Sequence, residues 1–92
     1  MATYFMFGSY TLDALDEISA ERTENAAAII GDCGGKLEAV YALLGDTDLV
    51  LITDFPSTAA VMKASIALSS ELGIAFSSAP ALKAAEFDKL FD

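Results

Sequence analysis

A predicted β-hairpin at the centre of the chain constrains the fold more than any other feature. Two runs of strand-favouring residues, 40–43 and 48–52, flank the segment Leu44-Gly45-Asp46-Thr47, where glycine and aspartate favour a turn. A strand and a helix are expected before the hairpin, and a helix and a strand are expected after it. The chain is therefore predicted to contain two strand–helix–strand units that meet at this hairpin.

The other elements follow from residue type and spacing. Aromatic, β-branched or alternating apolar residues indicate strands, whereas apolar residues at steps of three and four indicate helices. Ser57 or Thr58 is expected to cap the second helix, which Gly73 ends, and residues 83–92 are expected to form a short helix or turn. The predicted strands are residues 2–10, 36–43, 48–54 and 74–82.

Two interpretations fit the first helical segment. Thr11 can cap a helix that runs from Leu12 to Asp32 and ends at Gly34-Gly35, and such a helix is about 30 Å long. That length is large for a domain of this size, and Ser19 offers a second cap if the helix is broken there. Arg22 interrupts the apolar stripe of this segment.

The order of elements predicts an α+β sandwich of the ferredoxin-like type, βαββαβ, when both crossovers are right-handed. In this fold a four-stranded antiparallel sheet has the order 4-1-3-2, and both helices cover one face. Strands 2–10 and 48–54 then lie at the centre, which agrees with their apolar residues on both faces. Glu38 and Pro80 favour edge positions for the other two strands.

The second face of this sheet needs a cover, because the central strands are apolar on both faces. Left exposed, it would form a large hydrophobic patch, and the composition of 54% hydrophobic residues points to the same excess. We predict a homodimer in which two copies pair sheet against sheet, with a contribution from the C-terminal segment. The alternative is that this segment covers the face of its own chain. Phe87, Leu90 and Phe91 are expected to return to the body.

Charge and missing residue types exclude several classes of function. The formal net charge of −9 repels phosphate backbones and anionic lipid headgroups, so neither nucleic-acid nor membrane binding is expected. Cys33, the single cysteine, can form no intramolecular disulfide, and no apolar run approaches the roughly 20 residues that span a bilayer. A cytoplasmic location is expected. Histidine is absent, which excludes histidine-activated nucleophiles, and no catalytic residue, metal site or cofactor is predicted.

Five short motifs, spread over nearly the whole chain, match the pattern of a known family. They are Tyr4, Tyr10-Thr11, Gly34-Gly35-Lys36, Leu44-Gly45-Asp46-Thr47-Asp48 and Glu86-Phe87-Asp88. Their order resembles the GYD-domain family, small bacterial and archaeal proteins that carry no agreed chemistry. In the motif that names the family, Gly45 and Asp48 match, and Thr47 stands where a tyrosine is expected. The resemblance implies one ferredoxin-like domain over residues 1–92. Similarity to the wider group of dimeric α/β barrel proteins implies face-to-face pairing of sheets.

The candidates for a ligand site are Tyr10, Thr11, Gly45, Asp46 and Asp48. Tyr10 ends a central strand near the helix start, where its hydroxyl can orient a small molecule. Asp46 and Asp48 can bind a hard cation or hydrogen-bond a ligand. In the structural alternative, Asp46 shapes the turn and Asp48 accepts hydrogen bonds from backbone amides at the strand start. The alternative is favoured, because the sequence offers no third oxygen-donor cluster nearby.

Three functions stay open at this stage. The first is a homodimeric domain that binds a small apolar or aromatic molecule, between sheet and helices or at the dimer interface. The second is a cofactor-independent enzyme of the dimeric α/β barrel type, which rests on similarity of fold alone. The third is a structural or regulatory interaction module without a ligand.

Overall fold

A computed structural model describes residues 1–12 and 19–92 of the chain. The strands are β1 (Ala2–Tyr10), β2 (Lys36–Ala42), β3 (Leu49–Phe55) and β4 (Ile74–Ala81), and the helices are α2 (Ala20–Asp32), α3 (Thr58–Leu72) and α4 (Ala84–Lys89). The predicted hairpin is confirmed, since a short loop joins β2 to β3 and the Leu43 amide donates to the Asp48 carbonyl at 2.8 Å.

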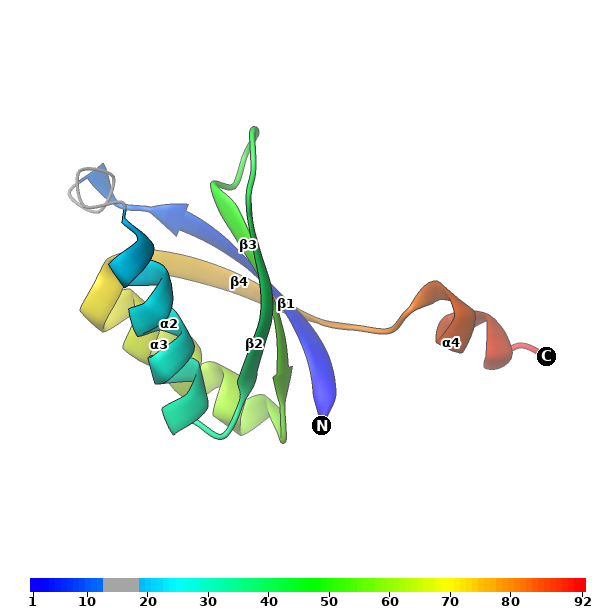
Figure 1. Cartoon of the computed structure of the whole chain (residues 1–92). Helices are drawn as coiled ribbons and strands as arrows, with labels where there is room; N and C mark the ends of the chain where they lie inside the picture. Colours follow the sequence, from blue (N-terminus) through cyan, green and yellow to red (C-terminus); the bar gives the residue numbers. More distant parts are fainter. Residues whose placement is uncertain (13–18) are drawn as a thin grey trace.

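The sheet has the order β2-β3-β1-β4, and every neighbouring pair is antiparallel. This order confirms the predicted arrangement, with β1 and β3 at the centre and β2 and β4 at the edges. Helices α2 and α3 lie together on one face of the sheet (Figure 1). The expected βαββαβ fold is therefore present.

The hydrophobic core lies between the sheet and these two helices. Alternate residues of the central strands point into it, and Met6, Leu51 and Phe55 are at most 2% exposed. Ile30 of α2 and Leu68 of α3 meet them from the other side and are fully buried. Complete burial of a side chain of this size contributes about 1.5–3 kcal/mol, so this layer holds the helices on the sheet.

The helix ends are set by side chains and by glycine. Ser19 has an extended backbone, and its hydroxyl accepts a hydrogen bond from the Arg22 amide at 3.2 Å, so α2 starts after a break at this residue. The interpretation with the break is the correct one, while residues 13–18 of the expected helix lie outside the described residues. Ser57 caps α3 in the same way, and Gly73 ends it with a left-handed backbone at φ 69°.

Strand β2 does not keep the two-residue alternation of a regular strand. Its register shifts between Leu37 and Ala39, which makes a β-bulge at Glu38. Leu37 therefore pairs with Thr53 on the helix-covered face, whereas Tyr41 pairs with Val50 on the opposite face. A bulge adds one residue to a two-residue repeat, and so it reverses the faces of the residues that follow.

The C-terminal segment was expected to return to the body, and this expectation is wrong. Residues 82–92, called the C-terminal arm below, are exposed throughout, and helix α4 projects beyond the end of β4 (Figure 1). Phe87, Leu90 and Phe91 are 52%, 66% and 76% exposed. The reason is local: Lys83 keeps an extended backbone, so the chain continues along the direction of β4 before it turns into a helix.

Within the residues that the structure describes, no helix is long and apolar enough to cross a membrane.

The junction between α2 and β2 gives a test of the core. A Cβ atom added at Gly35 would lie 2.5 Å from the buried Phe55 ring and 2.9 Å from the Asp54 carbonyl oxygen, whereas one at Gly31 meets nothing within 4 Å. We expect Gly35→Ala to lower the free energy of unfolding by about 1–3 kcal/mol through overpacking. Gly31→Ala, the control within α2, should raise it by about 0.5–1 kcal/mol. Urea unfolding measures both, and equal stabilities would contradict the close packing at Gly35.

Candidate functional site

A crevice of about 180 Å³ opens between the sheet and α2. Its walls are mainly apolar and come from all four strands and from the first half of the helix. The lining residues are Tyr10, Arg22, Thr23, Ala26, Val40, Ala42, Leu49, Leu51, Ile74 and Phe76. A concave apolar site with few polar groups is the usual form of a small-molecule site.

The crevice carries a buried cation. Arg22 lies in the first turn of α2 and is only 8% exposed. Its guanidinium carbon lies 5.6 Å from the centre of the Tyr10 ring, within the range of a cation–π interaction. Tyr10 and Arg22 thus place one aromatic ring and one positive charge together on an otherwise apolar wall.

Gly8 allows the floor of the crevice to form. A Cβ atom at this position would lie 2.7 Å from both the Leu49 and Phe76 side chains, which line the crevice. The absence of a side chain lets these two residues close over β1. Neighbouring side chains therefore approach the backbone closely at Gly8.

Asp48 holds the end of β1 in place. Its Oδ2 atom accepts a hydrogen bond from the Tyr10 amide at 2.8 Å, and its own amide donates to the Gly8 carbonyl at 2.8 Å. The next residue, Thr11, donates its amide to the Gly73 carbonyl at 3.1 Å. These bonds tie the hairpin loop and the end of α3 to the strand that presents Tyr10. Asp48 thus accepts a hydrogen bond from a backbone amide, as its structural interpretation predicts, but the amide lies at the end of β1 and not at the start of β3.

The predicted candidates divide into two groups. Tyr10 lines the crevice, and Thr11 and Asp48 fix the backbone beside it. Gly45, with φ 149°, and Asp46 are exposed in the hairpin loop, and neither is among the described residues that line the crevice.

Sequence reasoning missed the helical side of the site. It did not assign Arg22, Thr23 or Ala26 to a crevice, and it did not single out Phe76. One signal was available, because Arg22 interrupts the apolar stripe of the first helical segment. A charge on the buried side of a helix is expected either to pair or to serve a site.

The face of the sheet opposite the helices, called the open face below, is a second notable surface. By strand register it carries apolar residues near its centre, with Phe5 opposite Ile52 and Phe7 opposite Val50. The Phe5 and Phe7 rings lie 6.4 Å apart, and Tyr41 on the edge strand β2 is 57% exposed. A hollow of about 710 Å³ separates one end of this face from the base of the C-terminal arm.

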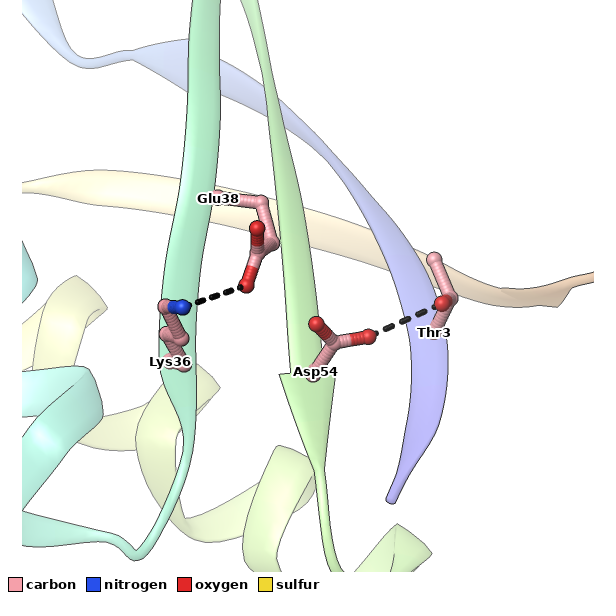
Figure 2. A network of polar contacts seen from close by, with 4 residues as sticks. All are labelled: Thr3, Lys36, Glu38 and Asp54. Carbon is pink, nitrogen blue, oxygen red and sulfur yellow. Dashed lines mark hydrogen bonds and ion pairs between the residues drawn. The ribbon is translucent and has the colours of Figure 1, made fainter.

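Polar side chains border the open face near this hollow (Figure 2). The Thr3 hydroxyl donates to Asp54 Oδ1 at 2.9 Å, and Lys36 Nζ lies 3.4 Å from Glu38 Oε1. Thr3, Glu38 and Asp54 also line the hollow. An apolar centre with a polar border is the usual anatomy of a protein interface.

Among residues 1–12 and 19–92, no group of three or more cysteine and carboxylate side chains lies close enough to hold a metal ion.

The two hairpin carboxylates are expected to differ in their effect on stability. Asp48→Ala removes the acceptor of the part-buried Tyr10 amide and should lower the free energy of unfolding by about 1.5–3 kcal/mol, the contribution of a hydrogen bond to a charged group. Asp46→Ala changes an exposed loop residue and should alter the free energy of unfolding by less than about 0.5 kcal/mol. Urea unfolding of both variants makes the comparison. A loss at Asp46 as large as that at Asp48 would contradict the structural role of Asp48.

The fold is similar to that of two solved transcriptional regulators. The leucine response regulatory protein LrpA of Mycobacterium tuberculosis matches with a TM-score of 0.59 and 13% identity, over 89% of this chain and 51% of that one. An AsnC family transcriptional regulator from Agrobacterium tumefaciens matches with a TM-score of 0.59 and 20% identity, over 89% of this chain and 50% of that one. This chain thus spans about half the length of either protein. At these identities the similarity establishes the fold alone.

A search of curated proteins finds no significant match. The family model of the GYD domain matches residues 4–91, which agrees with the five motifs of the sequence. Because this match covers nearly the whole chain, the protein belongs to the GYD domain family.

Proposed function

We propose that this chain is a self-associating domain that binds a small, largely apolar or aromatic molecule in the crevice between the sheet and α2. One observation carries the proposal: the apolar crevice contains the Arg22 guanidinium beside the Tyr10 ring, 5.6 Å from its centre. The apolar walls supply affinity through burial, and the ring and the charge can orient a ligand.

The position of Arg22 supports a role beyond helix stability. A positive charge in the first turn of a helix opposes the helix dipole, which favours acidic residues there. Burial of the guanidinium adds a desolvation cost. The buried guanidinium and its contact with the Tyr10 ring make Arg22 the residue of α2 best placed to orient a ligand in the crevice.

The size of the crevice limits the ligand. Its volume of about 180 Å³ is smaller than the ~300–1,000 Å³ of typical drug-sized sites, so the ligand should be close in size to one aromatic ring or a short branched aliphatic molecule. The M. tuberculosis protein of the same fold is described as a leucine response regulator, and leucine falls in this size range. DNA binding is not proposed for this chain, because its net charge of −9 repels the phosphate backbone.

Self-association is proposed through the open face. Phe5, Phe7 and Ile52 lie half-buried on a sheet face without a helix layer, and Tyr41 extends this apolar area to the edge strand. The border formed by Thr3, Asp54, Lys36 and Glu38 gives the area the polar rim of an interface (Figure 2). A second copy presents the same surface, so a two-fold dimer buries the open faces of both copies against each other.

Ligand binding is tested by thermal shift with a set of small aromatic and branched aliphatic compounds, leucine included. A ligand at 100 times its Kd stabilises the fold by about 2.7 kcal/mol, which should raise the Tm by several degrees. Ala42→Phe should remove this shift, because Ala42 lines the crevice. Ala28→Phe, at an exposed position of the same helix as Arg22, should keep it. Crevice binding is rejected if no compound shifts the Tm, or if a shift persists in Ala42→Phe.

Self-association is tested by light scattering at micromolar concentration. The native chain should have the mass of a dimer, whereas Phe7→Glu should be a monomer because it places a charge at the centre of the open face. Ile66→Glu adds the same charge at a 70% exposed position on α3 and should stay dimeric. A monomeric native chain would reject the dimer while leaving the crevice proposal intact.

A further inference from the structure

We infer that the C-terminal arm of one copy packs on the open face of a second copy, so that two chains exchange their arms. The inference rests on the self-association proposed above and goes further, because it assigns a function to residues 82–92. Helix α4 has six residues and all of them are exposed.

The form of the arm calls for a partner surface. Isolated helices shorter than about 12–15 residues are marginal in water, and most helical stability in proteins comes from packing of an apolar side. Helix α4 and the turn after it do have such a side, since Phe87, Leu90 and Phe91 follow at steps of three and four. The Phe87 and Phe91 rings lie 5.3 Å apart and form one exposed apolar surface.

The arm does not cover the open face of its own chain. It projects away from the sheet (Figure 1), and a hollow of about 710 Å³ lies between its base and that face. The walls of the hollow are apolar Phe5 and Ile52 on the sheet side and Leu82 on the arm side. Each chain therefore exposes two apolar surfaces, the open face and the side of the arm that carries Phe87 and Phe91, and the hollow lies between that face and the base of the arm.

A second copy can bury the open face and the apolar side of the arm at the same time. When two open faces meet about a two-fold axis, each arm already extends past the end of its own sheet, toward the partner. Insertion of the partner's apolar side chains between arm and sheet buries Phe87 and Phe91 together with Phe5 and Ile52. The arm surface and the open face thus become one continuous interface, with the polar border of Thr3 and Asp54 at its rim.

The contribution of the arm is measured on the full-length chain. The double variant Phe87→Ala/Phe91→Ala should raise the Kd of self-association at least about tenfold, which corresponds to about 1.4 kcal/mol. The matched control, Asp88→Ala/Lys89→Ala, removes two exposed charged side chains of the same arm and should leave the Kd within about threefold. An unchanged Kd in the aromatic variant would overturn arm exchange and leave the sheet dimer standing. A native chain that is monomeric would overturn both.

Exchange between copies is separated from folding back by a mixed-label experiment. A spin label is attached at Lys89→Cys in a Cys33→Ala background, and these chains are mixed with isotope-labelled Cys33→Ala chains that carry no spin label. Arm exchange should broaden the amide signals of Phe5, Phe7 and Ile52 in the isotope-labelled copies. Broadening of these signals only when label and isotope are on the same chain would overturn the inference, and so would the absence of broadening on the open face.

Discussion

The packing of one face of the central strands against two helices is the interaction on which the rest of the structure depends. Met6, Leu51 and Phe55 reach full or nearly full burial only because Ile30 and Leu68 meet them from α2 and α3. The crossovers that deliver these helices also fix the strand order and bring β1 and β3 to the centre. The crevice, the open face and the direction of the arm all follow from this one-sided layer.

The crevice lies between the sheet and the first half of α2. Helix α2 begins only at Ala20, after the break at Ser19, and its first turn places Arg22 over the Tyr10 ring instead of an aliphatic side chain over the sheet. The backbone on the other side is held in place by Asp48, which binds the Tyr10 amide. In the proposed function, a strand end held in this way forms one wall of the site before the ligand binds, which lowers the ordering cost of binding.

The open face and the C-terminal arm both expose apolar side chains because a small domain has a limited core. A chain of 92 residues with 54% hydrophobic composition cannot bury all its apolar side chains in a single layer between sheet and helices. Phe5, Phe7 and Ile52 remain on the open face, and Phe87 and Phe91 remain on the arm. In the proposed dimer a second chain buries both groups, so the proposals for the open face and for the arm address the same exposed apolar side chains.

The sequence by itself determined the strands, the second helix and the order of the elements, because strand alternation, helix spacing and capping residues are local signals. The sheet topology followed from that order, because crossovers are right-handed. It also identified the edge strands through Glu38 and Pro80, and the hairpin through Gly45 and Asp46. Only the tertiary structure decided the faces of β2, since the bulge at Glu38 depends on pairing with β3. Only the tertiary structure joined Tyr10 to Arg22 and sent the arm away from the body. Contacts between residues distant in sequence depend on how whole layers pack and carry no local pattern, and no residue pattern marked the extended backbone of Lys83 that directs the arm.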